Sequence, residues 1–254
     1  MNFEYNEIKG KRVLVTGASS GIGAAIARQF GARGARVGIH YGKNHIAALA
    51  VLRMIRKSGG EGKLFGGDLR IEKVAQNLMR DFVRAFGGID VLVNNAGALY
   101  TYRHFSQLDG KMFDDMFVLH SKAPFLLMQA AFVPMQKQRF GRIINISTNA
   151  ITYAGSHTLN YCASKAALEA ISAGFAREGA KDNILVNVVR CGLIDTPMHR
   201  KTQEYGETRF QERIKMIPLG HAGSPDDIAQ MVLFLASACG DFITNEIFTI
   251  AGGE

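Results

Sequence analysis

Residues 12–30 read RVLVTGASSGIGAAIARQF. The first five residues form a short apolar run rich in β-branched side chains, which predicts a buried strand. Glycines follow at positions 17, 21 and 23, and an alanine-rich helical segment comes next. A glycine-rich turn at the start of a helix lets the backbone approach a phosphate, which the helix N–H groups and dipole attract. The stretch therefore predicts a nucleotide-binding strand–turn–helix unit, although its GxxxGxG spacing differs from the commoner GxGxxG.

Short apolar strands alternate with longer helical segments through the rest of the chain. The predicted strands are residues 12–16, 35–39, 63–65, 91–94, 142–147, 184–189 and 246–250. The predicted helices are residues 21–32, 44–58, 72–86, 110–138, 158–180 and 225–237. Strands that are apolar throughout are typical of parallel sheets covered on both faces. We therefore predict an α/β protein with one Rossmann-type domain over residues 1–254, in which helices cover both faces of a doubly wound sheet of seven parallel strands.

The composition is that of a globular protein with a sizeable core. The 254 residues are 47% hydrophobic and 20% charged, which excludes disorder, and no uninterrupted apolar run of about 18 residues indicates a membrane span. The N-terminal stretch MNFEYNEIKGKR lacks the apolar core of a signal peptide, so we expect a cytoplasmic location. The three cysteines form no CxxC pair, and we expect neither disulfides nor a metal site.

The charge balance is basic. Thirty Lys and Arg against 22 Asp and Glu give a net charge of +8, which could indicate nucleic acid. The charges are scattered, however, and no basic run of five or more residues occurs. A protein that handles an anionic cofactor or an acyl carrier has the same balance. We expect a small-molecule or carrier-bound substrate, and neither nucleic acid nor a membrane as partner.

The residues that follow the predicted strands are the candidate cofactor contacts, because ligands of parallel sheets bind where the strands end. The second strand ends in His40-Tyr41-Gly42-Lys43, without the carboxylate that binds the ribose 2′-hydroxyl of NAD. This favours NADP, with Lys43 beside its 2′-phosphate, and His40 is either a further contact or a solvated strand-end residue. Asp68 either accepts a hydrogen bond from the adenine amino group or caps the next helix. The predicted contacts are Gly17, Ser19, Ser20, Gly21, Ile22, Gly23, His40, Tyr41, Gly42, Lys43, Asp68, Leu69, Asn95, Ala96 and Gly97.

Tyr161 and Lys165 are the candidate catalytic pair. They lie four residues apart and hence on one face of a predicted helix. A free phenol has a pKa of about 10 and is a poor acid–base catalyst at neutral pH, but an adjacent ammonium would lower that pKa. The alternative is an ordinary Tyr–Lys pair on a solvated helix. Thr148, at the end of the fifth predicted strand, places a hydroxyl at the same edge of the sheet.

Together these motifs resemble the short-chain dehydrogenase/reductase family. The resemblance rests on TGASSGIG (16–23), NNAG (94–97), a hydroxyl thirteen residues before YCASK (161–165), VNVVRCGLIDTPM (186–198) and the double glycine 252–253. It covers the chain from about residue 10 onward. Among the members, the chain most resembles the 3-oxoacyl-[acyl-carrier-protein] reductases and the sugar or polyol dehydrogenases.

The resemblance implies an oxidoreductase that transfers a hydride between NADP(H), less favourably NAD(H), and a carbonyl or secondary alcohol. Tyr161 would be the general acid for reduction, and Lys165 would bind the nicotinamide ribose and lower the tyrosine pKa. Thr148 would polarise the carbonyl in place of the family's serine, because its neighbour Ser147 should face the other side of the strand. Further implied cofactor contacts are Tyr161, Lys165, Gly192, Ile194 and Thr196. Family members are usually homotetramers, so we expect a homotetramer or homodimer.

The chain departs from the family pattern near this site. His120 aligns with a catalytic asparagine that holds a water, and it could hold that water, break the relay or be a satisfied core residue. Cys191 stands where the family has proline, which should loosen the turn that holds the nicotinamide, and Arg190 replaces a small residue. These departures suggest, as an alternative to an active enzyme, a catalytically weak NADP(H)-binding sensor or scaffold. The net charge alone suggests a second alternative, a nucleic-acid-binding module.

The segment 193–217 is the candidate substrate-covering segment by resemblance. Its aromatic and basic side chains, which include Tyr205, Phe210 and Arg213, could contact an anionic or carrier-bound acyl group. They could equally form an amphipathic helix with a solvated basic face. Behind the catalytic hydroxyl, Asn149, Tyr153 and His157 are candidates to line the pocket.

Overall fold

The structure is a computed structural model that describes residues 6–98, 103–153, 155, 157–200 and 206–254. One sheet of seven parallel strands runs through it, in the order β3-β2-β1-β4-β5-β6-β7. The strands are β1 (Arg12–Val15), β2 (Arg36–Tyr41), β3 (Glu61–Gly66), β4 (Val91–Asn94), β5 (Gly141–Thr148), β6 (Ile184–Cys191) and β7 (Ile247–Ile250). The strand order reverses between β1 and β4, so the carboxyl ends of these two strands border the crevice in which such sheets bind ligands. The predicted α/β fold class is confirmed.

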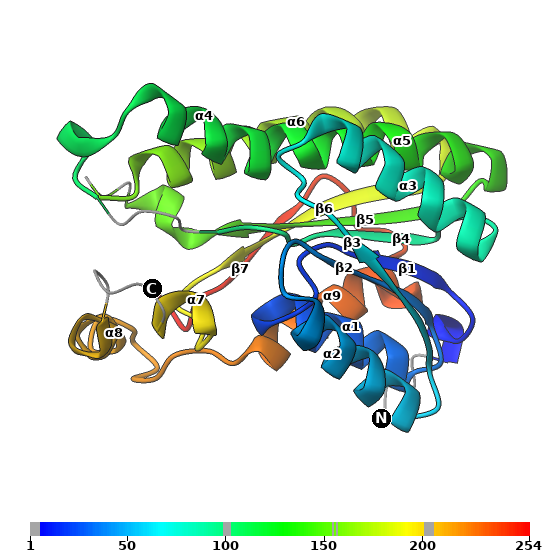
Figure 1. The fold of residues 1–254 in the computed structure, drawn as a ribbon, viewed down its shortest axis with the longest axis horizontal. Coiled ribbons are helices and arrows are strands. Elements are labelled where there is room, and N and C mark those ends of the chain that lie inside the picture. Colours follow the sequence, from blue (N-terminus) through cyan, green and yellow to red (C-terminus); the bar gives the residue numbers. More distant parts are fainter. Residues whose placement is uncertain (1–5, 99–102, 154, 156, 201–205) are drawn as a thin grey trace.

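Helices cover both faces of the sheet, as Figure 1 shows. One layer contains α1 (Gly21–Ala32), α2 (His45–Lys57) and α9 (Pro225–Ala236). The other contains α3 (Glu72–Phe86), α4 (Gly110–Phe117), α5 (Ala123–Gln138) and α6 (Leu159–Gly179). Two short helices, α7 (Pro197–Arg200) and α8 (Gly206–Ile214), lie beyond one end of the sheet, close to the C-terminal end of the chain. Short 3-10 turns complete the set: η1 (Asn6–Ile8), η2 (Phe105–Gln107), η4 (Asn149–Thr152), η5 (Ala180–Asp182) and η6 (Ala238–Gly240).

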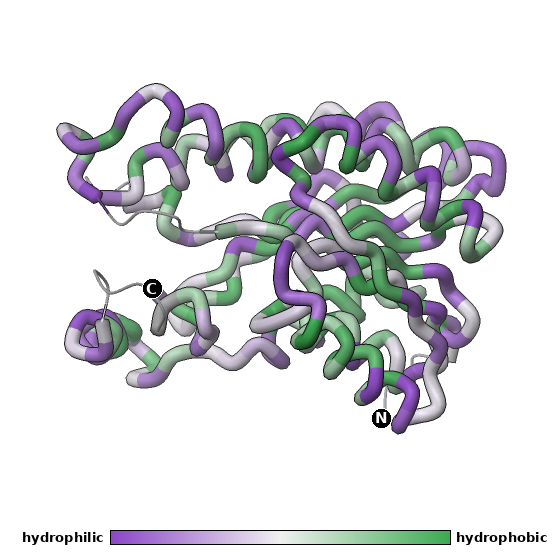
Figure 2. Tube along the Cα trace, viewed as in Figure 1, coloured by the Kyte–Doolittle hydropathy of each residue, from purple (hydrophilic) through white to green (hydrophobic). Residues whose placement is uncertain are grey.

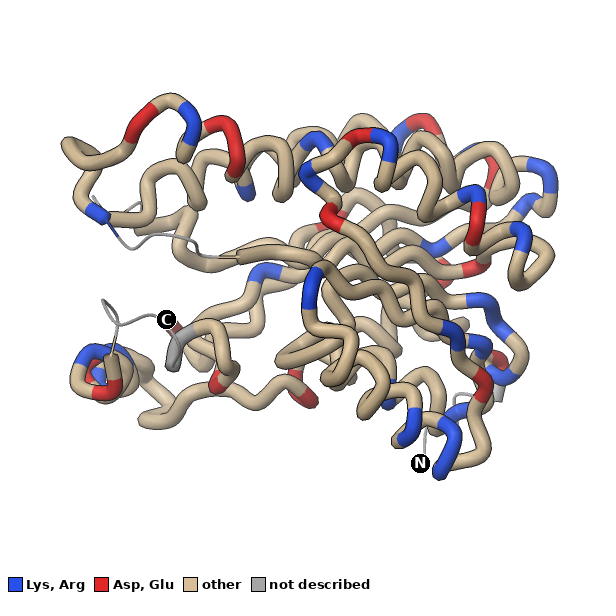
Figure 3. The backbone as a smooth tube through the Cα atoms, viewed as in Figure 1, with Lys and Arg blue, Asp and Glu red and all other residues tan. Residues whose placement is uncertain are grey.

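The sheet separates two hydrophobic cores. Val13 and Val15 pack with the layer of α1, α2 and α9, whereas Leu14 between them packs with α3, α5 and α6. This alternation follows from the two-residue period of a strand, and it explains why strands buried on both faces need apolar residues throughout. In Figure 2 the strands are accordingly mostly hydrophobic, while hydrophilic segments follow the outer sides of the helices. Figure 3 shows Lys and Arg interspersed with Asp and Glu over both layers.

The predicted helix 110–138 is not regular. Between α4 and α5 the chain forms a π-helical turn, η3 (Val118–Lys122), with His120 at its centre. Gly110–Gln138 is, by length and composition alone, apolar enough to cross a membrane, but 56% of its most apolar stretch is buried inside the fold. There α5 packs against α3 and α6, as a core helix does. A π-turn often marks a functional site, and this one lies beside the candidate catalytic helix.

Two further elements differ from their predicted bounds in ways that affect the site. β6 continues to Cys191, which pairs in register with Thr148 on one side and Ile250 on the other. The expected loosening at this position is wrong, because a cysteine, unlike a proline, has an N–H group and can continue a strand. The segment 193–217 contains both α7 and α8 rather than one helix. The remaining boundaries agree with the predicted ones to within about two residues.

Candidate active site

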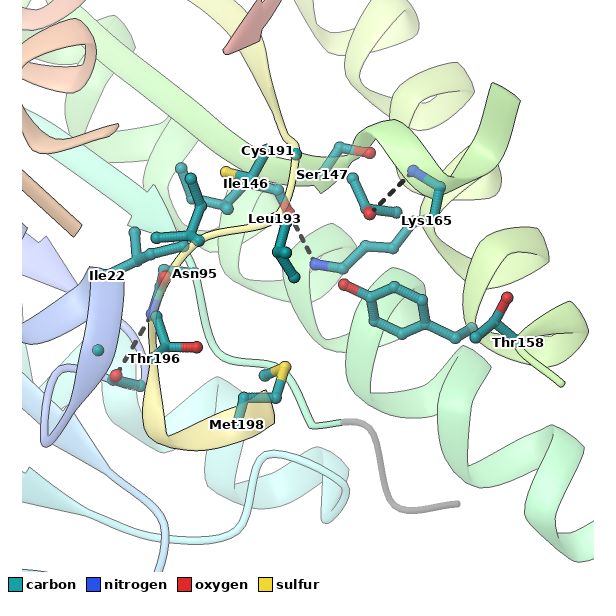
Figure 4. Close-up of a pocket in the computed structure, with 18 of the residues that line it drawn as sticks. Ile22, Asn95, Ile146, Ser147, Thr158, Lys165, Cys191, Leu193, Thr196 and Met198 are labelled. Atoms are coloured by element: carbon teal, nitrogen blue, oxygen red, sulfur yellow. Dashed lines mark hydrogen bonds between the residues drawn. The ribbon is translucent and has the colours of Figure 1, made fainter. Parts of the chain in front are cut away.

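A pocket of about 290 Å³ lies at the carboxyl ends of the strands. Its wall combines the glycine-rich turn, the ends of β4, β5 and β6, the start of α6, and the segment after β6. In Figure 4, Thr196 and Met198 lie across this space from Lys165 of α6 and from Thr158, which precedes that helix. The predicted residues among the pocket lining are Gly17, Ser20, Gly21, Ile22, Asn95, Gly97, Thr148, Tyr161, Lys165, Gly192, Ile194 and Thr196. These residues are far apart in the sequence, but they follow different strands of one parallel sheet. The topology brings the ends of those strands to one edge, and the residues therefore line one pocket.

The glycine-rich turn is built so tightly that side chains would not fit. Gly17 has φ +64°, and an ideal Cβ on it would lie 2.8 Å from the Cα of Ala96. A Cβ on Gly23 would lie 2.4 Å from both the carbonyl oxygen of Gly17 and the Nδ2 of Asn95. Gly21 also has a positive φ, of +54°. The side chain of Ser20 makes no capping hydrogen bond at the start of α1, which leaves the dipole end of this helix directed at the pocket rim.

The turn after β4 is fastened to the glycine-rich turn. Thr16 Oγ1 accepts hydrogen bonds from the backbone N–H groups of Asn95 and Ala96, both at 2.9 Å. The side-chain amide of Asn95 donates to the carbonyl of Thr16 at 2.9 Å and to that of Gly17 at 3.3 Å. These bonds hold two strand ends at a fixed separation, and Asn95 and Gly97 line the pocket beside them.

His40 is buried beneath the glycine-rich turn rather than solvated. Only 2% of it is exposed; Nδ1 accepts from the backbone N–H of Gly17 at 3.2 Å, and Nε2 donates to the carbonyl of Gly67 at 3.0 Å. This excludes the reading of His40 as a solvated strand-end residue, and both ring nitrogens are used within the protein. Burial lowers its pKa to about 4, although the Gly67 hydrogen bond and the charge of Asp68 act in the opposite direction. The neutral imidazole thus supports the turn from below.

We expect the protein to lose stability as the pH falls from about 6.5 towards 4. In the unfolded chain an imidazole takes up a proton below about pH 6.5, whereas the folded His40 stays neutral down to about pH 4. The stability that the neutral form contributes is therefore complete above pH 6.5, and about 3 kcal/mol of it is lost over this interval.

Urea-unfolding midpoints between pH 8 and pH 4 measure this loss. His40→Asn keeps an oxygen for the Gly17 N–H but cannot titrate, so its midpoint should vary less with pH than that of the wild type. His221→Gln, at an exposed position, is the control and should follow the wild type. Parallel curves for the wild type and His40→Asn would contradict the assignment.

The residues that follow β2 and β3 do not belong to the pocket lining, and they carry charges of both signs. Lys43 is exposed, and its charge, like that of Arg70, helps to lower the pKa of Asp68. The largest cause of that lowering is the hydrogen bond from Arg70, whose guanidinium contacts the Asp68 carboxylate at 2.6 Å. Asp68 also accepts from the backbone N–H of Arg70, while Leu69 is buried in the core with 4% exposure. The negative charge of Asp68 is therefore balanced locally.

Tyr161, Thr148 and Lys165 meet in the pocket. The Thr148 side chain lies close enough to the Tyr161 hydroxyl to act on its pKa, and Thr148 Oγ1 accepts from the backbone N–H of Ala150 at 3.2 Å. Lys165 is 4% exposed, and its ammonium donates to the carbonyl of Ile146 at 2.7 Å, as Figure 4 shows. Tyr161 and Lys165 are thus on one face of α6, and that face is buried against β5 rather than solvated.

The pKa values of this cluster differ from the expected ones. Burial raises the pKa of the Tyr161 phenol, Cys191 acts in the same direction, and the Thr148 side chain opposes them. Burial lowers the pKa of Lys165 to about 8, against the raising effect of Cys191 and Glu169. The expectation that the Tyr161 pKa is lowered is therefore wrong, because desolvation is the largest cause that acts on it and raises it. The phenol is protonated at neutral pH.

His120 has the contacts of a satisfied core residue, one of its three interpretations. It is fully buried, Nε2 accepts from the backbone N–H of Ala98 at 3.2 Å, and Nδ1 lies 3.0 Å from Ser164 Oγ. Burial and the charge of Lys165 lower its pKa, so the ring is neutral. Its ring also packs edge-to-face on Tyr161, with centroids 5.2 Å apart. His120 thus joins the turn after β4 to α6 and supports the Tyr161 ring.

Ser147, which lines the pocket, and Arg190 both bind Glu169, in a network that the sequence did not predict. Arg190 forms a two-pronged ion pair with Glu169, at 2.8 and 2.6 Å. Ser147 Oγ donates to the same carboxylate at 2.6 Å. Because the Ser147 hydroxyl is engaged by Glu169, Thr148 is the hydroxyl that meets Tyr161. The only sequence signal for Glu169 was its position one helical turn after Lys165.

The substrate-covering segment is anchored by its own small core. Leu193, Phe210 and Ile217 form this cluster, so Phe210 is buried away from the pocket. Met198 and Arg213 line the pocket, as does Tyr153, whereas His157 stacks edge-to-face on His104. Tyr205 lies outside the described residues. Among the residues that the structure does describe, no group of three His, Cys, Asp or Glu side chains could hold a metal ion.

Known proteins are similar to this chain over nearly its whole length. A family model described as Enoyl-(Acyl carrier protein) reductase matches residues 17–254. The 3-oxoacyl-[acyl-carrier-protein] reductase of Aquifex aeolicus is 34% identical over 252 residues, which cover 97% of this chain and 98% of that protein. The matches therefore extend from the glycine-rich turn to the residues after β7.

Solved structures share the fold over the same length. A crystal structure of a 3-oxoacyl (acyl-carrier-protein) reductase from Agrobacterium tumefaciens C58 with NADP bound gives a TM-score of 0.92 at 30% identity, covering 100% of this chain and 98% of that one. A double mutant of a Serratia marcescens short-chain dehydrogenase/reductase gives a TM-score of 0.89 at 32% identity, covering 97% and 98% of the two chains.

Proposed function

This chain belongs to the short-chain dehydrogenase/reductase family, and on that premise we propose that it reduces a carbonyl group to a secondary alcohol with NADPH, or catalyses the reverse oxidation. It is an oxidoreductase of this family that uses a nicotinamide cofactor. The observation that carries the finer proposal is the cluster of Tyr161, Thr148 and Lys165 in a pocket that extends to the glycine-rich turn. The bound NADP of the Agrobacterium relative supports the choice of cofactor.

The residues of the pocket fit a dinucleotide. Gly17 and Gly23 leave no room for a Cβ, and the uncapped start of α1 favours a phosphate. This turn would hold the pyrophosphate, Lys165 the nicotinamide ribose, and the residues after β6, Ile194 and Thr196, the carboxamide. The bound nicotinamide would supply the hydride for reduction.

The protein's own part of the reaction is proton delivery and alignment. Tyr161, protonated at neutral pH, would donate its proton to the substrate oxygen as negative charge develops there. Thr148 would orient the same oxygen through its hydroxyl. Lys165, with its pKa of about 8, would remain an ammonium at neutral pH and stabilise the phenolate that the transfer leaves behind. Glu169 helps to keep this ammonium charged.

Variants of Thr148 and Ser147 show which of the two hydroxyl groups acts on the substrate oxygen. We expect Thr148→Ala to lower kcat about 10²-fold, because a hydroxyl that stabilises the developing oxyanion is lost. Thr148→Ser keeps that hydroxyl and should stay within a few fold of the wild type. Initial rates at saturating NADPH measure both. Ser147→Ala is the matched comparison, and a larger loss there than in Thr148→Ala would reverse the assignment.

Lys43 is the proposed contact of the 2′-phosphate. Because Arg70 neutralises Asp68, the positive charge of Lys43 favours an added phosphate beside it. We expect the protein to bind NADPH at least about tenfold more tightly than NADH, and Lys43→Ala to remove most of that preference. Fluorescence titration with each cofactor measures it, and Lys57→Ala on the exposed end of α2 is the control. A preference for NADH in the wild type would contradict the proposal.

The second candidate is a catalytically weak NADP(H)-binding sensor or scaffold. His120 favours it, because both ring nitrogens of this residue are used by Ala98 and Ser164 and do not hold a water for Lys165. A screen of NADPH oxidation over ketoacyl thioesters, ketoses and steroids separates the two functions: tight binding without turnover supports the sensor.

We also propose that the protein has a single domain, is cytoplasmic and forms a homotetramer or homodimer. Light scattering of the purified protein tests its oligomeric state.

A further inference from the structure

A carboxylate that the sequence did not single out lies in the wall of the pocket. After β7 the chain turns at Gly252 and Gly253, with φ +66° and +92°, and the carbonyl of Gly252 accepts from the N–H of Leu219 at 3.1 Å. This turn delivers Glu254 to the pocket that Tyr161 and Lys165 also line. Figure 1 shows this end of the chain beside α7 and α8.

The two oxygens of the Glu254 carboxylate differ. Its side chain is 6% exposed, and Oε1 forms an ion pair with Arg213 of α8. Oε2 is buried, and it has no hydrogen-bond partner among the described residues. An ideal Cβ on Gly192 would lie 3.2 Å from Oε2, so this oxygen faces the segment after β6 that lines the same pocket. A buried carboxylate oxygen without a donor is unfavourable, and a bound molecule could supply the donor.

The surroundings define what kind of donor fits. Arg213 already balances the charge of Glu254, so a second cation beside the guanidinium would be repelled. A neutral donor meets no such repulsion. The main-chain carbonyl of Glu254 accepts from Asn149 Nδ2 at 2.9 Å, which fixes the residue in place without using Oε2. An aliphatic acyl chain has no donor for this oxygen, whereas a hydroxyl group has one.

We propose that Glu254 Oε2 accepts a hydrogen bond from a hydroxyl group of the substrate, and hence that the substrate is a hydroxylated ketone of the ketose or hydroxycycloalkanone kind rather than a plain acyl chain. The proposal rests on the carbonyl reduction proposed above. Arg213 holds the carboxylate in the ionised, oriented state, and Asn149 holds its backbone. A site built around an unpaired polar atom strongly disfavours an analogue that lacks the matching group.

The test compares ketones that differ only in a hydroxyl and a methyl group. The pairs are 4-hydroxycyclohexanone with 4-methylcyclohexanone and 5-hydroxy-2-pentanone with 2-hexanone, and the readout is the ratio of kcat/KM within a pair. We expect the wild type to favour the hydroxylated member of at least one pair by about 10²-fold, and Glu254→Gln to reduce this ratio at least tenfold. Glu246→Gln, at an exposed position, should leave the ratio unchanged.

A binding measurement distinguishes the two proposals. Thermal shifts of the protein with NADPH and each corresponding alcohol report recognition without turnover, and they should also favour the hydroxylated member in the wild type only. Turnover or binding of both members with equal efficiency would overturn the role of Glu254 while leaving carbonyl reduction in place. A hydroxyl preference in binding, without turnover of any ketone, would support Glu254 and contradict the reductase.

Discussion

Replacement of Tyr161 by Phe is expected to lower kcat for carbonyl reduction about 10³-fold, within the range that general acid catalysis supplies. The substitution removes one oxygen and keeps the ring that packs edge-to-face on His120. Affinity for NADPH should stay within threefold, because Lys165 keeps its bond to the carbonyl of Ile146 and the glycine-rich turn is unaffected. Single-turnover rates and a fluorescence titration measure the two quantities separately.

Tyr153 provides a matched comparison, since it places a second phenol in the same pocket. Its hydroxyl is held by Asn149 at 2.9 Å, and Tyr153→Phe should cost less than tenfold. Burial raises the Tyr161 pKa, so the phenol keeps its proton, and the wild-type reduction rate should fall with rising pH only as Lys165, whose pKa is about 8, loses its proton. Retention of more than a tenth of the wild-type kcat by Tyr161→Phe would remove this residue from proton delivery.

The fold was predictable where local signals agreed with the topology. The bounds of α3 coincide with the predicted ones because its amphipathic pattern ends at Gly87, whose left-handed conformation (φ +81°) stops the helix. β6 was predicted two residues too short, because the apolar run ends at Val189, whereas the strand continues through Arg190 to Cys191. The π-turn at 118–122 contains neither glycine nor proline, so the sequence predicts one regular helix through this segment.

The candidate site was predictable where it follows strand ends, and unpredictable where it depends on pairs of charges distant in sequence. Tyr161, Lys165 and Thr148 were found because α6 and β5 meet at the predicted edge. The bond between Ser147 and Glu169 spans 22 residues, and the ion pair of Arg213 with Glu254 spans 41. No local sequence pattern identifies such partners, which explains why Glu169 and Glu254 were not predicted as residues of the site. The burial of His40 had no local signal either: it was expected to be either a cofactor contact or a solvated residue, and the structure excludes only the solvated one.

Gly23→Ala is expected to weaken NADPH binding at least about 10²-fold. In an ordinary helix this change stabilises by about 1 kcal/mol, because alanine has the higher helix propensity. Here the new methyl group would lie 2.4 Å from the carbonyl oxygen of Gly17 and the Nδ2 of Asn95. Neither atom can move freely, since Asn95 is bonded to Thr16 and Gly17 and the latter's N–H is bonded to His40. The strain must therefore displace the turn that would hold the pyrophosphate.

Gly110→Ala is the control, because it replaces a helical glycine by alanine outside the glycine-rich turn. Gly110 begins α4, and a Cβ there would meet nothing within 4 Å, so the substitution should leave NADPH affinity unchanged and the melting temperature equal or slightly higher. Fluorescence titration gives the affinities, and circular dichroism melting shows whether each variant is folded at the titration temperature. If folded Gly23→Ala bound NADPH within threefold of the wild type, the turn would not be the phosphate site, because a displaced cradle cannot keep its hydrogen bonds to a rigid pyrophosphate.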